Sequence, residues 1–338
     1  MNRARFAGFV AFDLPRVEDI RLDDVRTVEA LVAAMERSGG FTAKKVGLAL
    51  DLWHRMLADK ECTRVLSFPA DIMATGTRGV LVELAKRKWF DAIVTTCGTL
   101  DHDLARLWGD YHHGTFLADD HELHEKGIHR LGNVFVPQDV YGPLLESKLQ
   151  PILADLASSR HEWTTPELVW AVGERVAKEP KAGDSLIHWA TKNRIPVFVP
   201  GPTDGAFGSQ LWYYRQKDAK FRLDVLAEEQ RLADLVFGAK SLGALMVGGG
   251  ISKHHVIWWA QFHDGLDYAL YLTTAQEFDG SLSGARLREA VSWGKVKEKA
   301  SYVTVEGDAT VTLPLLAAAL SQRVAAKTAP TRRPIHEE

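Results

Sequence analysis

The stretch Leu242-Gly-Ala-Leu-Met-Val-Gly-Gly-Gly-Ile251 decides the fold class, because an apolar run of strand length ends directly in three glycines. A membrane helix needs about 18 apolar residues, and this run is shorter and interrupted by glycine. The stretch therefore predicts a buried β-strand followed by a tight loop.

Similar apolar, β-branched or aromatic runs recur along the chain, and several end at Gly, Pro or Thr. They cover residues 91–96, 133–136, 196–199, 244–247, 268–272 and 301–305. Segments of helical pattern lie between or before them, at residues 27–38, 43–60, 78–88, 166–178 and 222–239. Continuous apolar strands separated by helices are typical of a parallel sheet covered on both faces. We predict a doubly wound, Rossmann-like α/β fold with a mostly parallel sheet and additional N-terminal helices.

The chain shows no internal repeat and no convincing linker. We therefore expect one domain over residues 1–325, of which residues 1–60 form an N-terminal helical part. Residues 326–338 mix Lys, Arg, Pro and Thr without apolar periodicity, which predicts a disordered tail.

The composition narrows the class of protein. The 338 residues are 46% hydrophobic, and 41 basic against 44 acidic residues leave a net charge of −3, which argues against nucleic-acid binding. Two cysteines, Cys62 and Cys97, are too few for a disulfide framework and fit a reducing compartment. The apolar stretch near the start is broken by Asp13, so we expect neither a signal peptide nor a membrane segment. These features predict a cytoplasmic protein.

Ligands of an open parallel sheet bind at the carboxyl ends of its strands, where this chain places small or acidic residues. These follow five strands, at residues 95–98, 200–205, 248–250, 273–280 and 306–308. Together they predict one crevice. No G-x-G-x-x-G motif occurs, so each segment taken alone can equally be an ordinary strand-to-helix turn.

Ser292-Trp-Gly-Lys295 is a second candidate site. An amine beside apolar side chains or near another cation gives up its proton more easily and can form Schiff bases. The alternative is a surface lysine that lies over an aromatic face. Lys253-His-His255, directly after the glycines, is open to either a structural or a catalytic interpretation.

A third group is rich in metal-ligand residue types and raises a rival hypothesis, a metallohydrolase. It comprises Asp101-His-Asp103, His112-His113 and Asp119-Asp-His121-Glu-Leu-His124. Its spacings match no metal motif such as H-E-x-x-H, and helix capping on a solvated surface explains such residues as well. We therefore predict no metal site.

Several long motifs in a fixed order resemble the deoxyhypusine synthase family. They are Thr273-Thr-Ala-Gln-Glu-Phe-Asp-Gly280, Ser283-Gly-Ala-Arg286, Glu289-Ala-Val-Ser-Trp-Gly-Lys295, Gly248-Gly-Gly-Ile-Ser-Lys-His-His255, Thr203-Asp-Gly205, Gly127-Ile-His-Arg-Leu-Gly-Asn133 and Thr95-Thr-Cys-Gly98. The resemblance reaches from Ser38-Gly-Gly-Phe41 to about Leu320 and so covers nearly the whole chain.

The resemblance implies an NAD-dependent aminobutyl transferase. NAD takes a hydride from spermidine, 1,3-diaminopropane leaves, and the aminobutyl group passes through an imine on a lysine to an acceptor amine. The acceptor is a lysine of the hypusine-containing translation factor in deoxyhypusine synthases and putrescine in the related homospermidine synthases. The sequence separates these alternatives poorly. The resemblance also implies a homotetramer with active sites at a dimer interface.

Residue by residue, the resemblance makes Lys295 the imine-forming lysine and His254 the proton shuttle, both catalytic. Trp293 and Glu289 match the polyamine pocket. The positions that match residues around NAD are Thr95, Thr96, Gly98, Asp204, Gly248, Gly250, Thr274, Asp279, Ser283 and Asp308.

Two departures from the family pattern affect the substrate pocket. Ser209 and Leu282 replace acidic residues that hold polyamine ammonium groups, which predicts weaker binding of spermidine. A donor with a differently placed cation, such as an agmatine-type polyamine, then becomes plausible.

Further departures are His102 for a glutamate, and Asp71 and Trp258 for asparagines. Asp71 or Asp101 could supply a compensating charge from a neighbouring strand end. These departures point to an archaeal or bacterial branch of the family, whose donor and acceptor can differ.

Overall fold

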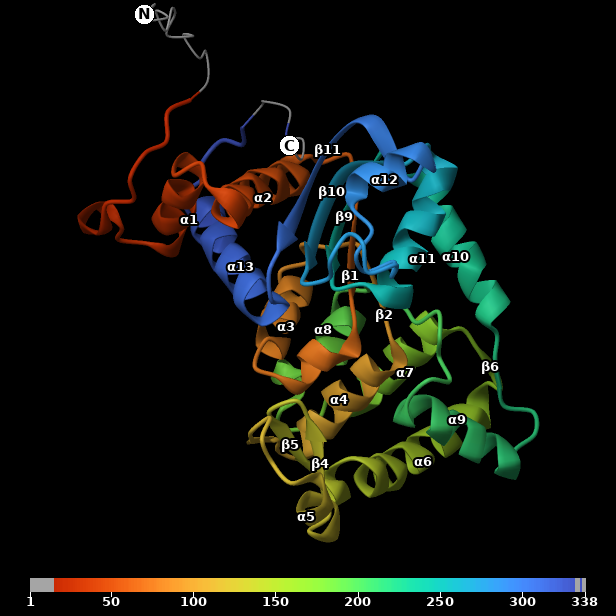
Figure 1. Ribbon diagram of the computed structural model, residues 1–338. Coiled ribbons are helices and arrows are strands. Elements are labelled where there is room, and N and C mark those ends of the chain that lie inside the picture. Colours follow the sequence, from red (N-terminus) through yellow and green to blue (C-terminus); the bar gives the residue numbers. More distant parts are fainter. Residues whose placement is uncertain (1–14, 332–334, 336–338) are drawn as a thin grey trace, which may run out of the picture.

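A six-stranded sheet forms the centre of the computed structural model, which describes residues 15–331 and residue 335 (Figure 1). The strand order is β11-β10-β9-β1-β2-β7, and every neighbouring pair is parallel. The strands are β1 (Cys62–Phe68), β2 (Ala92–Thr95), β7 (Val197–Phe198), β9 (Ser241–Val247), β10 (Leu266–Thr273) and β11 (Val296–Glu306). The predicted doubly wound α/β fold is confirmed.

Helices cover both faces of the sheet because successive strand residues point to opposite sides. On one face, Leu66, Leu245 and Leu270 belong to the larger apolar core. The helices packed there include α2 (Phe41–Ala58), α3 (Arg78–Lys86), α4 (Cys97–Trp108) and α13 (Ala309–Ala325). Their neighbours Met246 and Tyr271 face the second core. It is closed by α10 (Val225–Gly238), α11 (Gly250–Ala260) and α12 (Leu287–Ser292).

The remaining elements lie mainly in the lower half of Figure 1, below β1 and β2. The helices there are α5 (Asp120–Glu125), α6 (Gly142–Ser159), α7 (Thr165–Val176), α8 (Leu186–Lys192) and α9 (Ala206–Lys217). Two small sheets accompany them, one of β3 (His112–His113), β4 (Ile128–Leu131) and β5 (Val134–Pro137), the other of β6 (Glu162–Trp163) and β8 (Arg222–Leu223).

Two strand predictions need correction. Residues 133–136 do not join the main sheet, because β5 pairs antiparallel with β4 and β3. The strand Cys62–Phe68 was not predicted, although it lies in the middle of the sheet between β2 and β9. Its sequence carries Arg64, whose guanidinium pairs with Asp91 at 3.1 Å. This charged residue interrupts the apolar pattern by which a buried strand is recognised in a sequence.

Most predicted helices begin close to the expected residue because a side chain caps them. Thr27 accepts a hydrogen bond of 3.0 Å from the Ala30 amide at the start of α1 (Val28–Arg37). Thr164 and Glu167 form a capping box at α7. Asp224 caps α10, so the helix predicted from residue 222 begins at Val225.

The first and last α-helices of the described chain, α1 and α13, both pack on α2 (Figure 1). Arg323 of α13 pairs with Glu29 of α1 at 2.8 Å and with Asp51 of α2, which ties these three helices together. The tail predicted to be disordered is partly packed, since Ile335 is 1% exposed and its main-chain oxygen accepts a bond from the Tyr302 amide at 2.9 Å. Within the described ranges no helix is both long and apolar enough to cross a membrane.

Candidate functional site

A pocket of about 480 Å³ opens at the carboxyl ends of β1, β9, β10 and β11. Four residues predicted for the cofactor lie in its wall, namely Gly248, Thr274, Ser283 and Asp308. The remaining wall includes Leu131, Asn133 and Gly307, which lie in segments that the sequence named without a cofactor role, and Pro69, Ile72 and Thr310, which it did not name. Three of the five segments expected to line one crevice, 248–250, 273–280 and 306–308, contribute to this pocket, whereas 95–98 and 200–205 do not. The β4–β5 turn closes one side of it.

The triple glycine gives this pocket its close backbone wall. Gly248 has a φ of +66°, and a Cβ there would lie 3.1 Å from Pro69. A Cβ on Gly249 would lie 2.0 Å from the hydroxyl of Ser283, so no side chain fits between them. The amide of Gly250 donates to that hydroxyl at 3.2 Å. Since α11 begins at Gly250, the positive end of its dipole lies beside the pocket, which suits a phosphate group.

Asp308 both caps α13 and lines the pocket. Its side chain accepts a bond of 2.6 Å from the Thr310 amide and thereby caps α13. The residue is also exposed and lines the pocket, so its carboxylate can accept bonds from a ribose.

The structure does not place the other predicted cofactor residues in the pocket wall, which are Thr95, Thr96, Gly98, Asp204, Gly250 and Asp279. Thr95 is fully buried and donates its hydroxyl to the Phe68 oxygen at 2.7 Å. The hydroxyl of Thr96 accepts a bond from the Ala70 amide at 3.0 Å. Asp279 binds Ser281 within its own turn. These side chains shape the loops around the crevice.

Lys295 lies at the opposite edge of the sheet. It follows Trp293 and Gly294, which end α12, and it precedes the first residue of β11. The lysine is 8% exposed. Its ammonium nitrogen lies 5.1 Å from the ring centre of Trp293 and 5.6 Å from that of Trp258. Glu289 is exposed on α12. The sequence interpretation of a lysine in aromatic surroundings thus agrees with its geometry.

His254 approaches Lys295 from α11. Partial burial and the positive charge of Lys295 lower the pKa of His254 below its ordinary value. Its ring packs against Trp258 one turn further along α11, with ring centres 5.8 Å apart. A largely neutral imidazole beside an amine is suited to accept and return protons.

Lys253 lies beside the pocket, and the sequence interpretation named it only within Lys253-His-His255, without a role of its own. It is 1% exposed, and its ammonium group donates to the main-chain oxygens of Leu282 at 2.9 Å and Ala285 at 2.7 Å. The nitrogen also lies 3.8 Å from the ring centre of Tyr271. Lys253 therefore holds the segment that carries Leu282 and Ser283. A lysine among the apolar residues of α11 was the available signal.

The pocket and the main chain of Lys295 lie at opposite ends of the strands. The pocket is at the carboxyl ends of β9, β10 and β11, and Lys295 directly precedes β11. Ser209 is more distant still, because α9 and α12 lie at opposite ends of the molecule (Figure 1). The structure thus brings Lys295, His254 and Trp293 together but leaves Ser209 and most of the pocket away from them.

The residues of the metal hypothesis have other partners. Asp101 is fully buried and accepts bonds from the amides of Ala206 and Phe207 at 2.8 and 2.6 Å, where it caps α9. Burial raises its pKa, and it cannot supply the compensating charge considered for the polyamine pocket.

Asp103 is likewise buried, pairs with Arg78 at 2.8 Å and accepts bonds from the start of α8. Asp119 caps α5. Among residues 15–331 and 335, no three His, Cys, Asp or Glu side chains gather as metal ligands.

Comparison with known proteins gives the family. The sequence model of deoxyhypusine synthase matches residues 30–320, most of the chain. The chain belongs to the deoxyhypusine synthase family. A relative from Picrophilus torridus named "probable deoxyhypusine synthase" is 53% identical over 302 residues, which cover 89% of this chain and 96% of the relative. One of the same name from Thermoplasma acidophilum is 49% identical and covers 94% and 99%.

The fold of this deoxyhypusine synthase family member also has a solved counterpart. A crystal structure of a candidate deoxyhypusine synthase from Entamoeba histolytica matches 94% of this chain and 99% of its own, with a TM-score of 0.63 and 20% identity. At this identity the match supports the α/β fold alone.

Proposed function

We propose that the chain is a deoxyhypusine synthase, which transfers the aminobutyl group of spermidine to a lysine of the hypusine-containing translation factor. Lys295 carries the proposal, because a buried amine between two indole rings and beside His254 has the surroundings of an imine-forming nucleophile. Lys295 itself is 8% exposed, which limits access of water that would otherwise hydrolyse an imine.

The residues at the pocket fit NAD. Gly248 and Gly249 let a ligand approach the main chain, the start of α11 suits a pyrophosphate, and Asp308 can bind a ribose. When bound, NAD accepts the hydride that turns the donor amine into an imine and returns it at the end of transfer. Lys295 then bonds to the imine carbon while the bond to the leaving diamine breaks, and His254 moves the proton to that amine.

We further propose that the active site is shared between two copies of the chain within a homotetramer. The pocket lies at the carboxyl ends of β9, β10 and β11, whereas the main chain of Lys295 lies at the amino end of β11. A second copy that places its Lys295 against the first copy's pocket resolves the separation. The same arrangement can bring Ser209 from one copy to Glu289 of another. A symmetric dimer interface forms two such sites at once.

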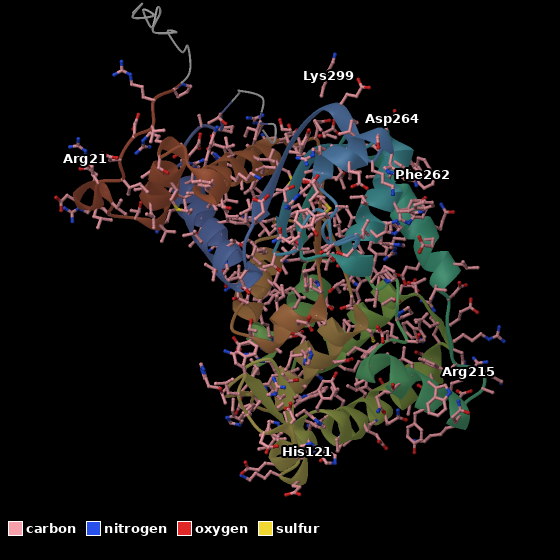
Figure 2. All side chains as sticks on the ribbon, viewed as in Figure 1. Arg21, His121, Arg215, Phe262, Asp264 and Lys299 are labelled. Atoms are coloured by element: carbon pink, nitrogen blue, oxygen red, sulfur yellow. The ribbon has the colours of Figure 1, made fainter. Side chains whose placement is uncertain are left out.

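The deciding experiment incubates the protein with NAD and labelled spermidine, with either the translation factor or putrescine as the acceptor. We expect label on a lysine of the factor, and label on Lys295 after borohydride reduction without acceptor. Lys295→Ala should lose both, whereas Lys299→Ala, which removes an exposed lysine of β11 labelled in Figure 2, should retain them. Label on putrescine alone identifies a homospermidine synthase-like enzyme, and no transfer from spermidine refutes the proposal.

A further inference from the structure

Trp258 and Trp293 form an aromatic pair around the nitrogen of Lys295. The two ring centres lie 5.6 and 5.1 Å from this nitrogen, within the roughly 6 Å over which a ring face attracts a cation. Trp258 comes from α11 and Trp293 from the end of α12, so tertiary packing brings the rings together. The geometry is that of a cation site with two aromatic walls.

No anion shares this site. Across the part of the chain that the structure describes, no carboxylate lies at ion-pair distance from the Lys295 ammonium group. Lys297, two residues further on, pairs with Asp267 at 2.8 Å. The aromatic faces therefore provide the nearest stabilisation of positive charge at Lys295.

Within one copy of the chain, the pair borders a hollow. A shallow hollow of about 580 Å³ adjoins it, lined by Trp258, Trp293, Gly294, Gln261, Phe262 and Asp264. Phe262 and Asp264 are labelled in Figure 2 at the outer edge of the molecule, beside α12. Trp258 is 46% and Trp293 66% exposed, so both rings remain accessible.

We propose that the aromatic pair binds one positively charged nitrogen at a time, and that Trp258 thereby couples amine binding to activation of Lys295. In the resting enzyme the occupant is the ammonium group of Lys295. An incoming alkylammonium group takes its place, and Lys295 releases one proton to solvent by way of His254. Like charges a few ångströms apart repel, so two cations cannot share the pair. The lysine is left as the neutral amine that a nucleophile requires.

The surrounding titratable groups fit this exchange. His254 on α11 is placed to take the proton, since its ring packs against Trp258. Glu289 on α12 and Asp264 after η5 (Gln261–His263) are exposed carboxylates that can attract the cation to the hollow. Trp258 acts as a positioning and specificity residue. The identity of the amine rests on the proposed function, whereas the cation exchange requires only an alkylammonium group.

The test is titration calorimetry of the full chain with butylammonium and spermidine, with neutral 1-butanol as the uncharged probe. Buffers of different ionisation enthalpy count the protons released. We expect about one proton per bound cation in the unmodified protein. Trp258→Leu should weaken binding of both amines roughly threefold to thirtyfold without affecting 1-butanol, and Trp258→Phe should restore most of it. Trp189→Leu, the control, removes an indole that faces Lys86 and Lys192 on α8 and should change nothing.

The Lys295→Met variant gives the more specific test in the same calorimetric titration. It should tighten alkylammonium binding about tenfold or more and abolish proton release, because the competing charge is gone. Adding Trp258→Leu to this variant should reverse the gain. Unchanged affinity in Trp258→Leu, equal binding of 1-butanol, or weaker binding in Lys295→Met overturns the proposal.

Steady-state kinetics show whether the bound cation is the donor or the acceptor amine. They also test the cation site separately from the proposed function. A higher KM for the donor in Trp258→Leu identifies the donor amine as the occupant, and a higher KM for the acceptor identifies the acceptor. If the unmodified protein transfers nothing from spermidine but the binding differences hold, the proposed function fails and the cation site stands. If Trp258→Leu transfers with unchanged kcat and KM, the cation site fails and the proposed function stands.

Discussion

Lys253 donates a hydrogen bond of 2.7 Å from a fully buried ammonium group to the main-chain oxygen of Ala285. This bond, with its companion to Leu282, joins α11 to the segment between β10 and α12. Because Ser283 of this segment lines the pocket, a side chain outside the pocket wall fixes part of it.

Lys253→Met keeps the length of the side chain and removes both hydrogen bonds. The partly buried carbonyl groups of Leu282 and Ala285 lose their donor, so we expect a loss of about 2 kcal/mol in the free energy of unfolding, together with weaker NAD binding. Urea unfolding and calorimetry measure the two effects. Lys297→Met, the control, breaks a partly exposed ion pair and should cost less than about 1 kcal/mol. Equal losses in both variants would contradict a specific role of Lys253.

The stability conferred by Lys253 should depend on pH. Burial lowers its pKa from the ordinary 10.5 to about 7. Between these values the unfolded chain binds a proton that the folded chain does not, so stability from this group rises with pH. It is fully present above the unfolded pKa and is lost as the pH falls through about 7.

We expect the difference in unfolding free energy between wild type and Lys253→Met to shift in favour of wild type from about pH 6.5 to 9.5. Urea unfolding of both proteins across this range measures it. A difference that stays constant argues that the lysine remains charged in its buried site.

Asp308→Asn should weaken NAD binding while the fold stays intact. Asparagine keeps the cap of α13, because its side-chain oxygen can accept the bond from the Thr310 amide, but it removes the charge from the pocket. We expect about a tenfold loss of NAD affinity by calorimetry, and an unchanged melting temperature. Asp308→Ala loses the cap as well and should also melt lower. If NAD binds both variants as it binds wild type, Asp308 is a helix cap alone.

Leu282→Asp should improve spermidine binding. Lys253 holds the Leu282 main chain, so a carboxylate introduced there is added to a fixed segment. A charge-assisted bond to an ammonium group corresponds to about a tenfold or greater gain in affinity.

Competition among spermidine, homospermidine and aminopropylagmatine measures this preference, with Ser209→Asp as the parallel variant. The interpretation of both positions fails if the unmodified protein already prefers spermidine with tight affinity and neither variant improves it.

Two inactive variants should restore activity when they are mixed, provided that sites are shared between copies. Lys295→Ala removes the nucleophile, and Thr274→Trp fills the pocket with an indole. A mixed dimer has one site in which both parts are intact, so refolding an equal mixture should give about a quarter of the wild-type activity. Each variant refolded alone is the control. No activity in the mixture would show that each chain carries a complete site. The molar mass of the unmodified protein, measured by light scattering, tests whether it is a tetramer.

The sequence predicted the fold class well and the individual strands less well. Apolar runs that end in glycine, as at Val247-Gly248, mark strands buried on both faces whatever their neighbours are. The strand Cys62–Phe68 was missed because Arg64 interrupts its apolar pattern. The strand β5 was assigned to the wrong sheet because the residues of a strand do not specify which strand it pairs with.

Some features of the candidate site could likewise be predicted from the sequence, and others could not. Trp293 stands two residues before Lys295, so the sequence alone predicted an amine beside an aromatic ring. Tertiary structure decided the second wall, Trp258, and the hydrogen bonds of Lys253, since both depend on how α11 packs against the segment after β10. It also decided that Thr95 faces the interior and that the pocket and Lys295 lie at opposite edges of the sheet. Local order along a chain determines which groups are neighbours within a few residues, whereas the path of the chain through the core determines every longer distance.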